Sequence, residues 1–343
     1  MNDMSGLITD QHKNEDAIPL HEDVCPIGSN IDKEVICPPQ MGKPRDDQCI
    51  GTPAEIVSEI AGRVCYDSIG KGRSSAEFHQ HILDIGHLSI YEHANFTLQL
   101  HGKSNQWPAF VPCLLNRPGI FVTAIEEAGI RFSVNLRAIL EWEERTTLWP
   151  SEAKVIGTYL QFWGNKIAPR VILNPPQGQF RLDIQQWSRL VPPKAMSEIW
   201  FTFWFKGSRG FSHELVRHGD WTAISQRSTR YCDESDAEMC WHPLLGDADF
   251  TVANDNGPLA INEASQSLYM RLANQLEVQG HTRKEARGAA RGVLPNAMAT
   301  QLVFSATLSQ WQHIIAMRCS EYADAEIRNI ISHVRDYLPK IQG

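Results

Sequence analysis

The chain has 343 residues, of which 42% are hydrophobic and 21% charged, and its formal net charge is −8. This is the composition of a globular protein with a sizeable core, and it excludes a disordered chain. A net negative charge argues against a nucleic-acid partner, because gripping a phosphate backbone needs a strongly basic face.

No run of about 18 apolar residues is present, which argues against a membrane-spanning helix. The stretch Met1–Leu20 also lacks the apolar centre of a signal peptide. We therefore expect a cytoplasmic protein that has no membrane partner.

Residues 1–52 are polar, contain several prolines and show little periodicity, which predicts an extended N-terminal arm. Cys25, Cys37 and Cys49 recur at even spacing in this arm. A metal site would need more closely spaced ligands, so we interpret them as thiols near solvent. Ordered structure is expected to begin near Pro53.

Apolar residues recur at helical spacing from Pro53 to about residue 66. Ser74 and Glu77 then have the spacing of a capping box, which predicts a second helix that ends at Gly86. Alternating apolar residues over 95–102 predict a strand after it.

Residues 105–205 differ in character, because they hold most of the ten tryptophans and many prolines. Within them, residues 120–136 predict a hairpin that turns near Gly129, followed by a short helix. The stretch 198–207 is almost continuously apolar, which predicts a strand buried on both faces.

Ser208 is a candidate N-cap for a short helix that ends at Arg217 and His218. Thr282 and Glu285 repeat the capping-box spacing further along the chain. The helices predicted in this part of the chain cover residues 208–218, 261–280, 283–293, 297–317 and 321–338.

The stretch between these first helices, Arg217–Tyr231, places Arg217, His218, Arg227 and Arg230 among several hydroxyl residues. Guanidinium groups, hydroxyls and backbone amides are the donors that a phosphate needs. The alternative is a solvated turn with ion pairs, because no glycine-rich phosphate-binding pattern is present.

His87, Glu92 and His93 lie between a predicted helix and a predicted strand, with His79 and His81 nearby. Histidine and glutamate can ligate a metal, but no helical HExxH spacing is present, and a strand turns successive residues to opposite faces. We favour a structural or ligand-contacting role for this stretch over a metal site.

Arg318 lies in an otherwise apolar helical stretch, where a guanidinium needs an anionic or carbonyl partner. The partner can belong to a ligand, or it can be an internal carboxylate such as Glu321 or Asp324. The sequence leaves both possibilities open.

Taken in order, these stretches resemble the flavin-dependent thymidylate synthases. The family's Arg-His-Arg motif and the serine that follows it are matched by 217–219 and Ser228. Residues 61–68, 86–98 and 291–328 add further matches. The resemblance covers about 55–105 and 205–338. It implies a catalytic domain over 53–343, interrupted by a Trp-rich insertion at about 105–205.

The resemblance implies an α/β (α+β) fold, with a mixed sheet flanked by long helices, and a homotetramer with active sites between subunits. The implied reaction is reductive methylation of dUMP at C5 to dTMP. Methylenetetrahydrofolate supplies the carbon, NADPH supplies the electrons, FAD relays the hydride, and no enzyme nucleophile takes part.

Residue roles carry over by position. Arg318 would be the catalytic residue, because a cation beside the pyrimidine favours its deprotonated form and raises the electron density at C5. The implied substrate contacts are Glu214, Arg217, Gln226, Arg227, Ser228, Thr229, Arg230, Arg291 and Arg318. The implied FAD contacts are His87, Ser89, Glu92, Arg217, His218, Gly219, Gln226, Thr307, Ser309 and His313; no metal is implied.

Some positions depart from the family's pattern. Gly219 replaces the second arginine of the motif, and Thr307-x-Ser309 replaces an Asn-x-Arg pattern. Losing two guanidiniums should weaken the binding of flavin phosphates by about 1–3 kcal/mol each. Arg137, in the insertion, is a candidate replacement.

Glu214 is the third departure, because the family usually has a glutamine there. A carboxylate prefers to accept from an amino or hydroxyl group, which motivates the same chemistry on UMP or dCMP, with a methyl or hydroxymethyl product. A nucleotide-binding paralogue without catalytic activity is the remaining alternative.

Overall fold

A computed structural model describes residues 22–29, 35–101, 119–126, 129–144, 181–183, 199–219, 221–245, 251–254 and 257–339. Two four-stranded sheets and the helices packed against them make up the described part of the chain. The strands of both sheets pair antiparallel. The predicted α+β class is confirmed, with antiparallel rather than mixed pairing among the described strands.

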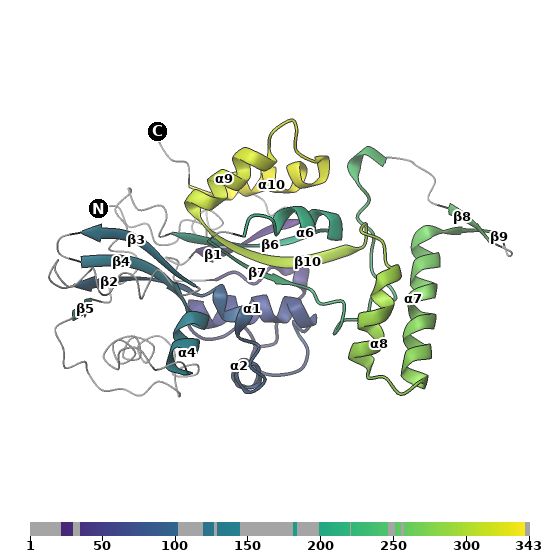
Figure 1. The fold of residues 1–343 in the computed structure, drawn as a ribbon, viewed down its shortest axis with the longest axis horizontal. Coiled ribbons are helices and arrows are strands. Elements are labelled where there is room, and N and C mark those ends of the chain that lie inside the picture. The colour runs from purple at the N-terminus through teal and green to yellow at the C-terminus, as the bar shows by residue number, and fades with distance from the viewer. Residues whose placement is uncertain are drawn as a thin grey trace.

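The central sheet has the strand order β1-β6-β10-β7. Its strands are β1 (Val24–Ser29), β6 (Trp200–Ser208), β10 (Ala299–Thr307) and β7 (Thr222–Gln226). Figure 1 shows helices on both faces of this sheet. The apolar stretch predicted to be a strand buried on both faces is β6, and nearly all of its residues are buried, which confirms the prediction.

The two faces of the sheet build two separate cores. Phe203 and Phe205 of β6 pack with Trp311 under α6 (Arg209–Leu215), α9 (Leu308–Arg318) and α10 (Ala325–Tyr337). Trp204 points the other way because side chains alternate along a strand. It packs into the second core, which lies between this face of the sheet and the helices α1 (Pro53–Tyr66) and α2 (Ser75–Asp84).

Helix starts follow the predicted caps. Ser74 and Glu77 form a capping box at α2, and Thr282 and Glu285 form one at α8 (Arg283–Ala290). The Ser208 hydroxyl accepts from the Phe211 amide at 3.0 Å, which caps α6. Each cap satisfies amides that a helix start leaves without partners.

The expectation that ordered structure begins near Pro53 is wrong, because β1 pairs with β6 at the edge of the central sheet. Val24, Cys25 and Ile27 are fully buried, although so short an apolar cluster gives little periodicity in the sequence. Cys25 is therefore not near solvent. Cys37 and Cys49 are half-buried, and their thiols are hydrogen-bonded to each other.

The helix predicted over 297–317 is also wrong in its first half. Residues Ala299–Thr307 form β10, which pairs with β6 and β7, and only then does α9 begin. The Thr307 hydroxyl accepts from the Gln310 amide at 3.2 Å and so marks the true helix start. Pairing on both sides of β10 overrides the local helical pattern.

The second sheet has the order β3-β4-β2-β5. It consists of β3 (Ile120–Glu126), β4 (Gly129–Asn135), β2 (Asn95–His101) and β5 (Arg181–Asp183). The predicted hairpin is confirmed as β3–β4, and α4 (Leu136–Glu144) follows it. Most of the Trp-rich insertion, at 102–118, 145–180 and 184–198, lies outside the described residues.

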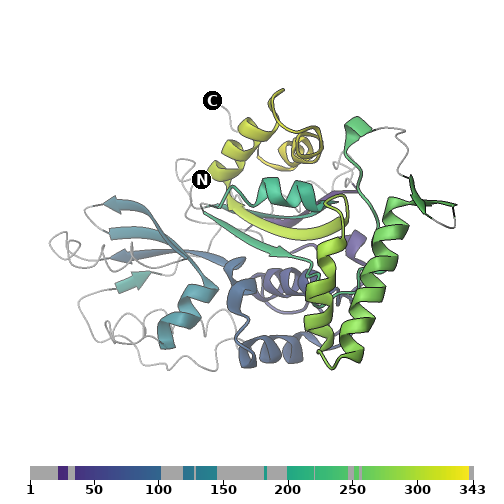
Figure 2. The same ribbon diagram turned by 45° about the vertical axis from the view of Figure 1, so that its right-hand side comes forward.

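α7 (Ile261–Val278) and α8 form a helical hairpin at the end of the molecule opposite the second sheet (Figure 2). A small ribbon of β8 (Thr251–Asn254) and β9 (Gly257–Ala260) precedes α7. Short 3-10 helices complete the described elements: η2 (Pro39–Met41), η3 (Leu88–Glu92), η8 (Pro243–Leu245) and η9 (Arg291–Val293). Among the described helices, none is long and apolar enough to cross a membrane.

Candidate functional site

Arg318, the last residue of α9, is held by the end of α6. Its guanidinium donates to the Glu214 carboxylate at 2.6 Å, to the Glu214 carbonyl at 3.1 Å and to His218 Nε2 at 2.8 Å. Neither Glu321 nor Asp324, the carboxylates suggested by the sequence, is its partner. These contacts orient the guanidinium but do not bury it completely, because 17% of the Arg318 side chain remains exposed to solvent.

His218 is the acceptor in this arrangement, so its Nε2 carries no proton. Burial lowers the pKa of His218, and the nearby charge of Arg318 and the neighbouring His313 lower it further. The two histidine rings meet edge to face at 6.0 Å. A neutral His218 is therefore the form that supports Arg318.

Glu214 is shared between two arginines. Its second oxygen pairs with Arg217 at 3.1 Å, while the Arg217 side chain is 67% exposed. The structure thus brings together five predicted site residues, the Arg318 cluster: Glu214, Arg217, His218, His313 and Arg318.

Gly219 follows directly after this cluster and is exposed. A Cβ built on it would have no atom within 4 Å, and its φ is not in the left-handed region. Neither packing nor backbone conformation therefore demands a glycine here. The missing arginine leaves open space beside the Arg318 cluster.

A second set of predicted residues lies past the far end of β7. It comprises the Ser228 cluster: Arg227, Ser228, Thr229, Arg230 and Arg291. The Ser228 amide donates to the Cys65 carbonyl at 3.0 Å, and Arg291 donates to the Thr229 hydroxyl at 3.2 Å. The structure joins the loop to α1 on one side and to η9 on the other.

Arg227 is held by two carboxylates, whereas Arg291 donates to a hydroxyl. Arg227 pairs with the fully buried Glu234 and lies 3.8 Å from Asp67. Arg230 and Arg291 are exposed. Guanidinium groups and hydroxyls that converge in this way suit a phosphate.

Sequence reasoning missed Arg209, the first residue of α6. Burial lowers its pKa, and the positive charge of Arg291 lowers it further. Arg209 lies in the predicted short helix, only eight residues before Arg217, and nothing in the residue pattern marks it as a ligand contact.

Three aromatic rings adjoin the Ser228 cluster. Tyr66, at the end of α1, lies edge to edge with His87, with ring planes 6° from parallel and centroids 6.4 Å apart, and its hydroxyl lies 2.5 Å from His87 Nδ1. Tyr231 meets both rings at an angle. Burial raises the pKa of Tyr66 to about 12. The rings offer an apolar wall with polar edges, and only His87 had been predicted.

η3 carries two more predicted contacts, Ser89 and Glu92. Ser89 is exposed, and the Glu92 carboxylate accepts from Arg137 of α4 at 2.5 Å. Arg137 also donates to Glu141 at 2.7 Å. The location of Arg137, which the sequence left open, is thus beside Glu92.

His93 fastens η3 to the central sheet. Its two ring nitrogens lie 2.8 Å from the Ser305 hydroxyl of β10 and 3.0 Å from the Ser225 hydroxyl of β7. Ser305 continues the chain to Thr202 of β6 at 2.7 Å. Burial lowers the pKa of His93 to about 3, so the ring is neutral and structural.

Two predicted contacts are occupied within the fold. The Gln226 amide donates to Ser212 at 2.9 Å and to Thr300 at 3.1 Å. Thr307 is buried and caps α9, while Ser309, which lies 3.1 Å from it, is exposed. The roles of these residues toward a ligand remain predictions.

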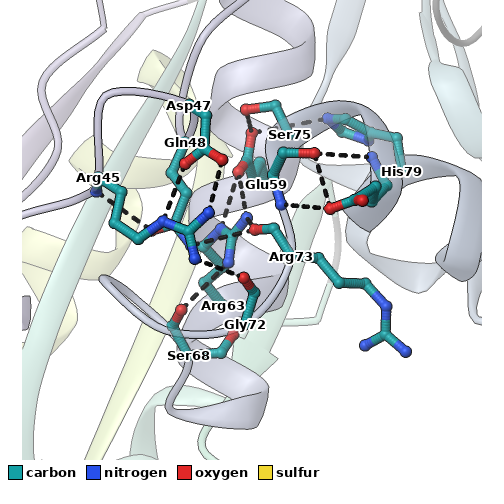
Figure 3. A network of polar contacts seen from close by, with 12 residues as sticks. Arg45, Asp47, Gln48, Glu59, Arg63, Ser68, Gly72, Arg73, Ser75 and His79 are labelled. Carbon is teal, nitrogen blue, oxygen red and sulfur yellow. Dashed lines mark hydrogen bonds and ion pairs between the residues drawn. The ribbon is translucent and has the colours of Figure 1, made fainter.

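The loop 67–73 places Asp67 near Arg227. Buried side chains hold this loop in place through its backbone carbonyls (Figure 3). Arg63 donates to the carbonyls of Ser68, Lys71 and Arg73, and pairs with Glu59 at 2.7 Å. Gln48 donates to two of the same carbonyls. The buried network fixes the end of α1, from which Tyr66 also projects.

The Arg318 cluster and the Ser228 cluster adjoin opposite ends of β7. They are also linked through α6, because Gln226 at the far end of β7 donates to Ser212, two residues before Glu214. Among the described residues, no group of three or more His, Cys, Asp or Glu side chains is placed to hold a metal ion.

Comparison with known proteins gives a family. Residues 184–341 match the model of the family described as thymidylate synthase complementing protein. The flavin-dependent thymidylate synthase of Mycolicibacterium gilvum is 38% identical over 183 residues, covering 50% of this chain and 67% of the relative. That of Mycobacterium sp. strain KMS is 33% identical over 198 residues, covering 53% and 75%.

A crystal structure of thymidylate synthase X from Helicobacter pylori, with FAD and dUMP, is 22% identical and covers 43% of this chain and 70% of that one. Its TM-score of 0.30 is too low to bear on the fold or on the site. The two sequence relatives are similar to this chain over two thirds or more of their own length. The chain therefore belongs to the flavin-dependent thymidylate synthase family of enzymes.

Proposed function

We propose that this chain catalyses the FAD-dependent reductive methylation of dUMP at C5 to dTMP, with methylenetetrahydrofolate as carbon donor and NADPH as electron donor. Membership of the family supports the reaction class. The observation that carries the proposal in this chain is Arg318, a partly exposed guanidinium fixed by a carboxylate, a carbonyl and a neutral imidazole.

The residues present suit a flavin. Exposed donors and cations stand at Ser89, Arg217, Ser309 and His313, and the space beside Gly219 admits a bulky group. When bound, the flavin supplies the hydride that NADPH provides. Arg217, His218, Gly219, His313 and Ser309 would hold it on one side, and His87, Ser89 and Glu92 on the other.

Substrate binding falls to the Ser228 cluster and to Glu214, Arg217 and Gln226. Hydroxyls and guanidiniums of the cluster would hold the nucleotide phosphate, with Arg209 as an added cation. Arg318 would face the uracil edge. A fixed cation there favours negative charge on the ring, and the neighbouring carbon C5 gains nucleophilic character without an enzyme nucleophile.

The assembly that the resemblance implies is part of the same proposal. We propose a homotetramer with shared sites, built from the domain over 53–343, with the N-terminal strand β1 completing its sheet.

Glu214 leaves the choice of pyrimidine to experiment. Each of its carboxylate oxygens is engaged by one arginine, so its charge is balanced within the cluster. Family membership supports dUMP, and dCMP and UMP are the alternative substrates that the test must separate.

The test has two steps. Purified protein is titrated with FAD and its absorbance near 450 nm is followed; tight binding is expected, and no binding would overturn the proposal. The holoenzyme is then given NADPH, methylenetetrahydrofolate and nucleotide tritiated at C5. Tritium release from dUMP is expected, and release from dCMP or UMP alone would reassign the substrate.

A further inference from the structure

The second sheet contacts the rest of the chain at two places that bear on the proposed site. Residues 119–144, which form β3, β4 and α4, lie outside the residues 184–341 matched by the family model. Their contacts fall on the turn after His218 and on η3. Both segments carry residues that we propose to contact flavin.

The first contact is a ring stack. Phe121 of β3 lies 4.7 Å from Trp221, with the two rings 29° from parallel, and 5.6 Å from Trp200. Trp221 has a φ of 55°, which is strained for a bulky side chain. Such a backbone conformation persists where its surroundings hold it in place.

The described residues of this turn make two further contacts near it. The Gly219 carbonyl accepts from the Thr222 hydroxyl at 3.0 Å, and the His218 amide donates to the Leu215 carbonyl at 3.1 Å. The stack of Phe121 on Trp221 adds a contact from outside the turn, at the residue with the strained φ.

The second contact is an ion pair. Arg137 of α4 bridges Glu92 of η3 at 2.5 Å and Glu141 of its own helix at 2.7 Å. The Leu136 amide also donates to the Ala94 carbonyl at 2.9 Å. The start of α4 is thus fastened to the end of η3, and the Glu92 carboxylate is aimed by a guanidinium.

We infer that the second sheet is a buttress for the flavin pocket, in which Phe121 and Arg137 are positioning residues. Phe121 fixes the turn after His218 through Trp221, and Arg137 orients the Glu92 carboxylate. The inference rests on the proposed function for the identity of the ligand, whereas the two contacts themselves do not depend on it.

The ring stack is tested with Phe121→Leu, which keeps apolar bulk, and with Phe121→Tyr, which keeps the ring. FAD dissociation constants are measured by flavin fluorescence, well below the unfolding temperature of each variant. An aromatic pair is worth about a three- to tenfold change in an equilibrium constant. We expect that loss in Phe121→Leu, recovery in Phe121→Tyr, and no additional loss when Phe121→Leu is combined with Trp221→Leu.

The ion pair is tested with Arg137→Ala and Arg137→Lys. Glu141→Gln is the matched control, because it removes the other carboxylate partner and leaves Glu92 paired. We expect Arg137→Ala to weaken FAD about threefold, in the range of a partly exposed charge pair, with the KM for dUMP unchanged at saturating FAD. Glu141→Gln should bind FAD as the unaltered protein does.

Hydrogen exchange of the backbone amides at 216–224, without flavin, separates this inference from the proposed function. Faster exchange in Phe121→Leu than in Phe121→Tyr is expected even if the unaltered protein fails to bind FAD, and this would leave the buttress standing while the proposed function falls. Unchanged exchange, or unchanged FAD affinity in Phe121→Leu and Arg137→Ala of a flavin-binding protein, would overturn the buttress.

Discussion

Two arginine–glutamate pairs in this molecule look alike in chemistry and differ in setting. Arg63 and Glu59 are 1% and 0% exposed, whereas Arg318 and Glu214 are 17% and 26% exposed. Both pairs join at 2.6–2.7 Å. The difference lies in what the remaining donors and acceptors of each pair do.

In the first pair the network is closed. Arg63 donates to three loop carbonyls, and the second Glu59 oxygen accepts from Ser75 at 2.6 Å (Figure 3). In the second pair, Arg318 donates to the titratable imidazole of His218, and part of its side chain is exposed to solvent. A closed pair serves the fold, while an open one keeps its charge available to a ligand.

The largest effect is expected from Arg63→Ala, which leaves Glu59 buried without its cation. Breaking a buried pair costs about 3–5 kcal/mol, and urea unfolding should show a loss of this size. Arg45→Ala is the control, because its pair with Asp47 is 46% exposed on both sides and is expected to contribute little to stability. Equal losses in the two variants would contradict the distinction.

Arg318→Ala, in contrast, should affect catalysis rather than stability. We expect it to lower kcat about 100- to 1000-fold, as removal of a preorganised charge does in other active sites. Flavin absorbance should be retained and the unfolding free energy should change little. Arg318→Lys should recover only part of the rate, because it cannot donate to Glu214 and His218 from one planar group. Normal turnover in Arg318→Ala would remove Arg318 from the reaction.

A third effect distinguishes the neutral His93 from the charged pairs. Its pKa of about 3 in the fold is far below its value of about 6.5 when unfolded. As the pH falls, His93 is therefore protonated in the unfolded chain before it is protonated in the fold. Its contribution to the free energy of unfolding is complete above pH 6.5 and is lost as the pH falls toward 3. Between pH 7 and pH 5 we expect a loss of roughly 2 kcal/mol from this group, measured by urea unfolding.

His93→Gln supplies the comparison for that measurement. It keeps polar atoms near Ser225 and Ser305 but cannot take up a proton in this range. The pH dependence of unfolding should become shallower by one proton between pH 5 and pH 6, even though the variant is less stable overall. An unchanged slope would show that His93 is not the group responsible.

The smallest effect is expected from Glu214→Gln, which keeps the shape of the open pair and removes its negative charge. We expect kcat/KM to fall less than about tenfold. Because the Glu214 charge raises the pKa of His218, its removal should move the acidic limb of the pH–rate profile to lower pH. If the acidic limb moved to higher pH instead, the Glu214 charge would not be what raises the pKa of His218.

Local signals predicted much of the fold. The capping boxes at Ser74 and Thr282, the hairpin at Gly129 and the buried strand over 200–208 are all encoded within a few residues of one another. The strands β1 and β10 were not predicted, because pairing with strands distant in sequence decides their conformation. The local propensity of a segment does not indicate whether such a partner strand exists.

The candidate site divides in the same way. The resemblance marked all five residues of the Arg318 cluster, but it did not reveal that Glu214 pairs with Arg217 and Arg318 or that Arg137 reaches Glu92. Tyr66 was missed because tertiary packing brings the end of α1 to the Ser228 cluster, whereas Tyr231 directly follows Arg230 in the sequence. Side-chain pairing across elements is a property of the folded chain.

The position of β1 has a practical consequence for anyone who shortens this protein. A version that starts at Pro53 would leave one edge of β6 without its partner strand. That edge belongs to a run of tryptophan and phenylalanine residues, and an unprotected apolar strand recruits strands from other molecules. The trimmed protein would be expected to aggregate during expression, although every proposed site residue would still be present.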